Sequence, residues 1–338
     1  MSRPVSALIG AVALAWAVPA ASQPVKMRVA DVYPVAHTVP TTTIRVFMDE
    51  VKKRLGEKIE FEYYPAEQIG KGKDLLNLTR SGVVDIGLIV PSYISDKLPL
   101  SAVAELPGAY SSSCQGTLAT HRLTVGEGAL ARNEFGPNGV RVLITHTFAP
   151  FQAVSSRPVE NLKGFEGQKL RTLGLVTDLT IKKMGAVPIR ISAPEINEAM
   201  GRGTIDGGLM GIATVASYDL GRYLKAVTQG ENFGGALVTY AISDANWRKL
   251  APEVQAALTE AGEIATRNGR EQADKALDAQ YEKLRAAKVP ILRFSAEDRK
   301  LFDAATADVG REWAETLDRR GRPASEVLKA FRTATPTN

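Results

Sequence analysis

The sequence predicts an α/β protein built from two similar lobes, and three observations lead to this prediction. Strand-like and helix-like segments alternate along most of the 338 residues, which is the pattern of βαβ units in an open sheet. The stretch SGVVDIGLIV at Ser81–Val90 is nearly repeated as RGTIDGGLMG at Arg202–Gly211. The length is too great for one modest core and suits two domains. We therefore expect two matching lobes with a ligand between them.

The start of the chain has the pattern of a secretory signal peptide. A short basic segment with Arg3 precedes the apolar run Val5–Val18, and small residues surround an expected cleavage point near Ala20–Ser22. A membrane anchor is the alternative, but it needs roughly 20 apolar residues, and this run is shorter. We expect residues 1–22 to be removed and the mature protein to be periplasmic.

The composition is that of an ordinary globular protein and argues against several partners. The chain is 44% hydrophobic and 23% charged, with a formal net charge of +5. No basic block carries interleaved aromatic residues, so nucleic acid is not an expected partner. Cys114 is the only cysteine, which excludes a disulfide within the chain.

The first half of the chain is predicted to alternate strands and helices. Alternating apolar and polar residues, or short continuous apolar runs, indicate the strands, and apolar residues three and four apart indicate the helices. The expected strands are 26–33, 58–64, 83–90, 140–147 and 151–155. The expected helices are 41–55, 74–79 and a longer helical region over 114–134.

The same pattern restarts in the second half. The expected strands are 168–172, 187–191, 204–210, 224–228, 237–243 and 291–294. The expected helices are 177–184, 195–200, 252–288, 296–319 and 325–332. A continuous helix over 252–288 would be ~54 Å long, so we expect it either to bridge both lobes or to kink at Asn268-Gly269.

The repeated stretch suggests a structural role for its glycines and aspartates. Gly82 and Gly203 are placed to end a helix in the left-handed conformation. Asp85 and Asp206 stand where a strand begins and are suited to capping a neighbouring turn or helix through its backbone N–H groups. The ligand is expected at the opposite, carboxyl ends of the strands, because open α/β sheets bind ligands there.

Known catalytic and metal-binding patterns do not occur in the sequence. There is no zinc spacing, EF-hand loop, nucleophile elbow or phosphate-binding loop, and no cofactor or metal is expected. An exported hydrolase or isomerase that uses scattered carboxylates or Cys114 in a cleft remains an alternative of another class. No catalytic residue is assigned.

A binding site around Arg171 is the favoured alternative. Arg171 ends a predicted strand, where a guanidinium can hold a carboxylate in a bidentate fork. The other interpretation of this residue is a surface arginine paired with a local glutamate. The further candidate ligand-binding residues lie near the ends of other strands: Tyr33, His37, Tyr93, Phe151, Gln152, Gly174 and Met210.

Several short motifs, in order and spacing, resemble one known family. They are YPAEQIG at 64–70, GVVDIG at 82–87, LPL at 98–100, ELP at 105–107, PVENLKG at 158–164, GQKLR at 167–171, MGAVP at 184–188 and RGTIDG at 202–207. The chain resembles the DctP-like solute-binding subunits of tripartite ATP-independent periplasmic (TRAP) transporters over nearly its whole mature length.

The resemblance implies a two-lobed periplasmic-binding-protein fold with hinge strands and a long helix that bridges the lobes. The implied divisions are a signal peptide at 1–22, lobe I at 23–147 with contributions from about 237–290, lobe II at 148–236, and the long helix with the C-terminal helices at 250–338. A monomer is expected.

The resemblance also implies that Arg171 binds the ligand's carboxylate. Met210 stands about where many members have an asparagine, and Phe151 falls near the place of a second arginine in sialic-acid-type members. These differences favour an aromatic or other weakly polar monocarboxylate; a sugar acid, keto acid or dicarboxylate is the alternative. The implied partners are TRAP permease subunits, and a sensor is the alternative destination.

Overall fold

Two β-sheets form the centres of two lobes in the computed structural model, which describes residues 24–336. Lobe I contains a five-stranded sheet in the order β2-β1-β3-β10-β4. Its strands are β1 (Val25–Ala30), β2 (Ile59–Tyr64), β3 (Ile86–Ile89), β4 (Val140–Thr147) and β10 (Leu237–Ser243). β1, β2 and β3 are parallel to one another, and β10 runs antiparallel to both of its neighbours.

Lobe II contains a six-stranded sheet in the order β11-β9-β5-β8-β6-β7. Its strands are β5 (Gln152–Ser155), β6 (Lys169–Thr172), β7 (Val187–Arg190), β8 (Gly207–Met210), β9 (Ala226–Thr228) and β11 (Ile291–Leu292). β6 pairs in parallel with both β7 and β8. Each lobe therefore has a parallel core to which antiparallel strands are added.

The chain crosses between the lobes by two short connections, from β4 to β5 and from β9 back to β10, and a third time along the long helix before β11. The segments 148–151 and 229–236, which make the two short crossings, lie side by side. Phe151 N–H donates to the Gly234 carbonyl at 2.7 Å, and Phe148 N–H donates to the Ala236 carbonyl at 3.0 Å. These segments are the expected hinge strands.

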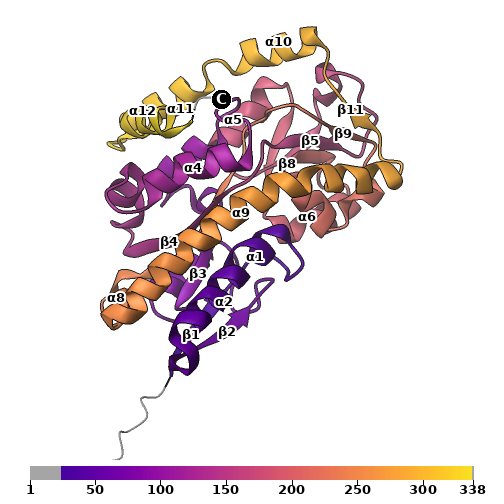
Figure 1. The fold of residues 1–338 in the computed structure, drawn as a ribbon. Coiled ribbons are helices and arrows are strands. Elements are labelled where there is room, and N and C mark those ends of the chain that lie inside the picture. The colour runs from indigo at the N-terminus through magenta and orange to yellow at the C-terminus, as the bar shows by residue number, and fades with distance from the viewer. Residues whose placement is uncertain (1–23, 337–338) are drawn as a thin grey trace, which may run out of the picture.

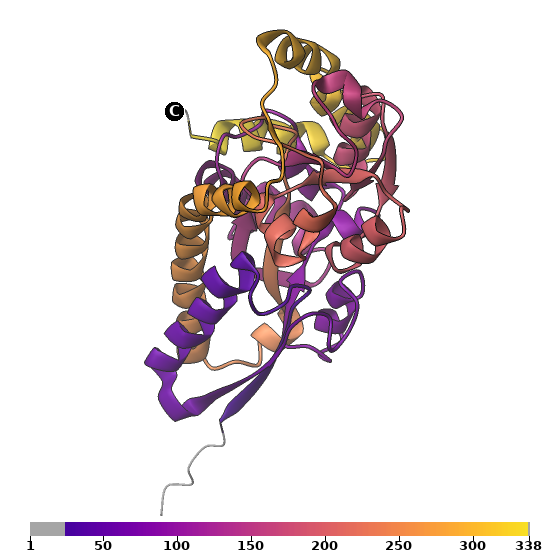
Figure 2. The same cartoon turned by 90° about the vertical axis from the view of Figure 1, so that its right-hand side faces the viewer.

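Helices cover the sheets, and one of them spans the molecule (Figures 1 and 2). The helices are α1 (Thr38–Thr42), α2 (Ile44–Leu55), α3 (Leu75–Arg80), α4 (Ser113–Thr124), α5 (Leu175–Lys183), α6 (Ile196–Gly201), α7 (Ile212–Ser217), α8 (Asp244–Trp247), α9 (Pro252–Ala286), α10 (Ala296–Thr306), α11 (Val309–Asp318) and α12 (Ala324–Ala334).

Helix α9 is the predicted long helix, and it is continuous through Asn268-Gly269. At one end it packs on α2 and β4 of lobe I, and at the other the Tyr281 hydroxyl donates to the Thr228 carbonyl of lobe II at 3.0 Å. Figure 1 shows it running diagonally from beside α8 to beside β11. Continuity through Gly269 fits close packing, because a β-carbon there would lie 2.6 Å from Thr43 Cγ2.

The repeated stretches have the same structure in both lobes. Gly82 and Gly203 both adopt a positive φ, of 76° and 68°, directly after a helix, as predicted. In each lobe the following aspartate binds the backbone of the adjacent parallel strand, Asp85 at Arg28 and Asp206 at Lys169. The two stretches are therefore similar in hydrogen bonding as well as in sequence.

Some predicted elements differ from the structure. The helical region expected over 114–134 contains α4, which ends at Thr124, and a separate short π-helix at Ala131–Phe135, because Gly126 and Gly128 interrupt it. The helix expected over 296–319 is two helices, α10 and α11. Several strands are shorter than predicted at their N-terminal ends, β3 and β8 among them.

The predicted signal peptide at 1–22 lies outside the described residues. Within residues 24–336, no helix combines the length and apolar character needed to cross a membrane.

Candidate functional site

The carboxyl ends of the parallel strands of the two lobes face each other. The Tyr93 hydroxyl, after β3 of lobe I, accepts a hydrogen bond from the Ala193 N–H of lobe II at 2.7 Å. A β-carbon placed on Gly174, after β6, would lie 2.8 Å from the Ser92 carbonyl oxygen. Only glycine therefore permits the observed approach of the lobes at this point.

Arg171 lies on β6 at this junction and is 2% exposed. Its Nε donates to the Ile191 carbonyl at 2.9 Å, and its Nη1 makes a longer bond of 3.4 Å to the Leu209 carbonyl. In the part of the chain that the structure describes, no carboxylate pairs with this guanidinium. A buried cation is costly unless an anion accompanies it, so the site is suited to an anionic ligand.

Aromatic side chains from lobe I and the hinge pack together next to this junction. The Tyr33 ring stacks on the His37 ring at 4.1 Å between centroids, and Phe148 meets both rings edge-on at 6.3 and 6.2 Å. Phe151 continues the group at 6.1 Å from Phe148. All four side chains are buried, so they give the site a predominantly apolar wall.

His37 is neutral and has a defined tautomer. Its Nδ1 accepts the Val39 N–H at 3.1 Å, which caps helix α1. Burial, and to a smaller extent the nearby His146, lowers the pKa of His37 from 6.5 to about 3. Because Nδ1 is the acceptor, the proton of the neutral ring is on Nε2.

Three tyrosine side chains lie within electrostatic range of Arg171. Burial is the main cause that raises the pKa of Tyr33, Tyr93 and Tyr218, and the charge of Arg171 acts in the opposite direction on all three. Tyr33 and Tyr93 come from lobe I, whereas Tyr218 follows helix α7 of lobe II. The phenols are therefore neutral and near one guanidinium.

A cavity of about 440 Å³ opens between the lobes beside this group. Lobe I contributes Tyr93 and Ser92 to its lining, and lobe II contributes Leu173 and Ile191. Tyr93 and Ile191 also contact Ala193 and Arg171 respectively, so the cavity adjoins the guanidinium. Its volume is that of a small-molecule site.

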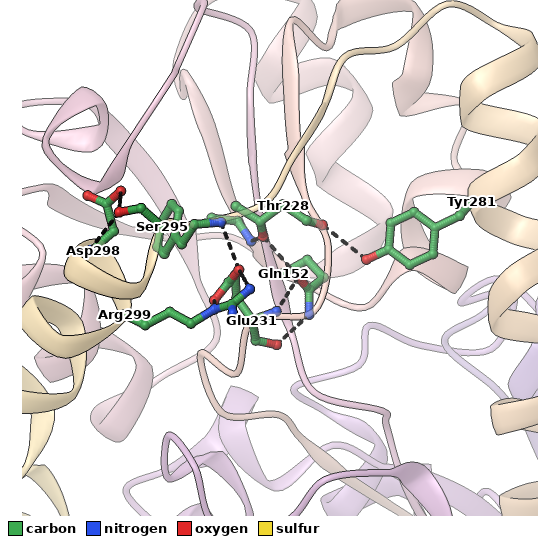
Figure 3. A network of polar contacts seen from close by, with 9 residues as sticks. Gln152, Thr228, Glu231, Tyr281, Ser295, Asp298 and Arg299 are labelled. Atoms are coloured by element: carbon green, nitrogen blue, oxygen red, sulfur yellow. Dashed lines mark hydrogen bonds and ion pairs between the residues drawn. The ribbon is translucent and has the colours of Figure 1, made fainter.

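Met210 and Gln152, neighbours in the pairing of β8 with β5, have different surroundings. Met210 packs over Gly208: a β-carbon on that glycine would lie 3.0 Å from Met210 Cε and 2.7 Å from Arg171 Cβ. Gln152 instead belongs to the hinge: its Nε2 donates to the Glu231 and Pro150 carbonyls, and its Oε1 accepts from Thr228. Both amide hydrogens of Gln152 are thus already used (Figure 3).

The hinge network extends from Gln152 through Glu231 to Phe294 and to Arg299 of helix α10 (Figure 3). Glu231 pairs with Arg299 of α10 through two bonds of 3.0 Å and accepts the Phe294 N–H at 2.9 Å. Through Glu231 the second hinge strand is tied to β5 and to α10. The hinge network therefore accounts for a glutamine at this position better than contact with a ligand does.

Most of the residues predicted for the site lie together, and two residues that were not predicted lie among them. Arg171, Tyr33, His37, Tyr93, Phe151, Gly174 and Met210 lie at the junction of the lobes, and Gln152 lies in the hinge. Phe148 and Tyr218 were not predicted. Phe148 begins a hinge crossing and was findable from its place after β4, whereas Tyr218 follows a helix and carries no positional signal.

Comparison with known proteins identifies the family. A model for the bacterial extracellular solute-binding proteins of family 7 matches residues 29–316. The chain belongs to this family. Family 7 consists of solute-binding proteins, so the family match argues against the alternative of an exported hydrolase or isomerase. The resemblance to TRAP binding subunits is confirmed.

Two relatives illustrate the range of similarity to this solute-binding protein. A solute-binding protein of Albidiferax ferrireducens is 27% identical over 187 residues, 55% of this chain and 54% of that protein. The C4-dicarboxylate-binding periplasmic protein DctP of Rhodobacter capsulatus is 25% identical over 356 residues, 98% of each chain. The chain thus spans about half the length of the first of these relatives.

Solved structures show that the fold is that of TRAP solute-binding proteins. One from Rhodoferax ferrireducens, with copurified benzoate, has a TM-score of 0.84 at 23% identity and covers 92% of this chain and 97% of its own. One from Bordetella bronchiseptica, with bound (R)- and (S)-mandelate, has a TM-score of 0.83 at 20% identity, with 92% and 99% covered. DctP7 of Bordetella pertussis, which binds pyroglutamic acid, has a TM-score of 0.81 at 22% identity, with 91% and 99% covered.

Proposed function

We propose that this protein captures a weakly polar organic monocarboxylate between its lobes and delivers it to a TRAP permease. The observation that carries the proposal is the buried guanidinium of Arg171, which has no protein carboxylate as a partner within residues 24–336. A ligand carboxylate would complete it through charge-assisted hydrogen bonds. The expected localisation is the periplasm, and the expected state is a monomer.

The surroundings of Arg171 favour an aromatic acid over a more polar one. The stacked and edge-on rings of Tyr33, His37 and Phe148 suit a flat apolar group. Of the cations that line the same cavity, Arg190 pairs with Asp178 at 2.6 Å and Lys71 pairs with Glu67 at 2.8 Å, and Lys73 lines it as well. The structures bound to benzoate and mandelate support the same ligand class by analogy.

Delivery requires that the lobes close on the ligand and open again. Contacts between the lobes, such as Tyr93 with Ala193 and Glu105 with Thr177 at 2.8 Å, stabilise the closed form. A ligand that touches Arg171 of lobe II and Tyr33 of lobe I adds to that stability only when the lobes meet. Closure is then a population shift driven by binding.

The test is calorimetric titration of benzoate, mandelate, pyroglutamate and a sugar acid into the mature protein and its Arg171→Met variant. Removal of the charged partner is expected to weaken binding of the best acid by about 2–5 kcal/mol. Arg202→Met is the matched control, because Arg202 is a surface residue paired with Glu198, with 76% of its side chain exposed. Unchanged affinity in Arg171→Met removes this residue from the site and contradicts the proposal.

A further inference from the structure

Two buried polar atoms at the junction of the lobes have no hydrogen-bond partner. They are His37 Nε2 of lobe I and Tyr218 Oη of lobe II, in rings whose centroids are 6.4 Å apart. Buried polar groups are nearly always hydrogen-bonded, so each such atom needs an explanation. Their positions on opposite lobes make a ligand held between the lobes the natural partner of both.

The hydrogen-bonding role of His37 is defined by its own helix cap. Val39 N–H donates to Nδ1 at 3.1 Å, so Nε2 carries the hydrogen and acts as a donor only. The pKa of His37, lowered by burial to about 3, keeps the ring in this neutral form. The ring stacks on Tyr33 at 4.1 Å, which holds the Nε2–H group beside the aromatic wall of the site.

Tyr218 belongs to the same site by its electrostatic surroundings. Among the groups that act on its pKa are the hydroxyl of Tyr93 and the charge of Arg171. Tyr218 follows α7, which begins two residues after β8 ends at Met210. Its hydroxyl can both donate and accept, so with His37 it offers at least one donor and one flexible partner.

Another unpartnered atom of this region faces elsewhere. His146 Nδ1 is also without a partner, but it lies 3.3 Å from the position of a β-carbon on Gly269 of α9. It therefore faces helix α9 and is not part of the proposed contact.

We infer that the ligand is a carboxylate with a second oxygen, a hydroxyl or carbonyl, which accepts a hydrogen bond from His37 Nε2 and contacts Tyr218 Oη. This inference rests on the proposed function, because it assumes that the carboxylate binds Arg171. It narrows the ligand class from weakly polar acids to acids with one further polar group. An acid that lacks this oxygen leaves a buried donor unpaired, which weakens binding by about tenfold or more.

The test compares ligands that differ only by one hydroxyl. Benzoate and its ortho, meta and para hydroxy derivatives are titrated into the mature protein, Tyr218→Phe and His37→Asn. Asparagine is a good helix N-cap, so His37→Asn removes the Nε2–H donor and keeps a capping group. Tyr218→Phe removes a single hydroxyl and provides a second variant that folds independently of the cap.

Tyr223→Phe is the matched control. Tyr223 is in the same lobe as Tyr218, and its hydroxyl contacts Asn197 at 3.2 Å. This variant is expected to bind all four acids as the unaltered protein does.

The unaltered protein is expected to bind at least one hydroxybenzoate about tenfold more tightly than benzoate. Tyr218→Phe and His37→Asn are expected to lose more affinity for the preferred hydroxybenzoate than for benzoate, so that most of that preference disappears. Equal binding of benzoate and all three hydroxybenzoates overturns the inference. The inference is also overturned if, in each variant, the affinities for benzoate and for the preferred hydroxybenzoate fall by the same factor. That result is expected if a trapped water satisfies the two atoms. Failure of the proposed function looks different: none of the acids binds, or Arg171→Met leaves every affinity unchanged.

Discussion

Asp85 and Asp206 make the same two hydrogen bonds in the two lobes. Asp85 Oδ2 accepts the Arg28 N–H at 2.8 Å, and its own N–H donates to the Arg28 carbonyl at 2.9 Å. Asp206 does the same with Lys169, at 2.8 and 2.7 Å. In both cases the partner lies on the adjacent parallel strand, so the aspartate holds the start of its strand in register. The two aspartates of the repeated stretches therefore have a structural role.

Replacement of either aspartate should lower stability and leave binding unchanged. In Asp85→Ala or Asp206→Ala a partly buried N–H of the neighbouring strand loses its acceptor, and we expect the free energy of unfolding to fall by about 1–3 kcal/mol. Urea denaturation measures this, and the asparagine variants, which keep one oxygen, should lose less. A change in ligand affinity beyond about threefold with intact folding would contradict a purely structural role.

Gly174→Ala should weaken binding by obstructing closure. The added methyl group would lie 2.8 Å from the Ser92 carbonyl oxygen across the junction, so the lobes cannot approach fully. We expect ligand affinity to fall about tenfold or more with little loss of stability in the open form, because a closed state that costs more is populated less. Calorimetry and small-angle scattering with and without ligand measure the two effects.

Gly221→Ala is the control for that experiment. A β-carbon there meets only side-chain atoms at 3.7 Å or more, an ordinary contact. Equal behaviour of the two glycine variants would show that the approach of Gly174 to Ser92 does not limit closure.

Acid should destabilise the protein partly through His37. The pKa of His37 is lowered from 6.5 to about 3 in the folded chain, so below the unfolded value only the unfolded chain binds this proton. Stability is then lost as the pH falls. Between about pH 6.5 and 4.5 the unaltered protein should lose about 2 kcal/mol more than His37→Asn. Urea denaturation at a series of pH values gives both curves, and parallel curves would show that His37 is not the group responsible.

The pair of Glu231 and Arg299 should contribute to the stability of the hinge region. Glu231 is buried and also binds the Phe294 N–H, whereas 47% of the Arg299 side chain is exposed. We expect Glu231→Ala to cost about 2–3 kcal/mol and Arg299→Ala less, because only the first leaves a buried N–H without a partner. A double-mutant cycle measures the coupling, and equal losses in the two single variants would contradict this asymmetry.

The sequence predicted the repeat, most elements and Arg171 because these depend on local pattern. Period-two and helical spacing indicate elements, and a positive-φ glycine after a helix was expected at Gly82 and Gly203. Gln152 was predicted to bind the ligand, but in the structure it belongs to the hinge. Its partners Glu231 and Thr228 come from a distant segment, and no local pattern indicates that pairing.

Tyr218 is a residue at the junction of the lobes that the sequence did not indicate. It follows a short helix, and its neighbourhood in the sequence contains no distinctive motif. The fold of lobe II brings its hydroxyl near Arg171, and the closure of one lobe on the other brings its ring near His37. The fate of a polar side chain depends on which distant groups surround it.

By itself the sequence determined the two-lobed α/β plan and the family, because apolar periodicity, turn glycines and short motifs act through neighbours in the chain, and it predicted Arg171 as the residue that binds a carboxylate. The tertiary structure alone decided which side chains meet across the junction, that Arg171 is buried without a protein anion within the described residues, and that His37 and Tyr218 keep unpaired polar atoms there. Those properties depend on burial and on contacts between segments far apart in the chain.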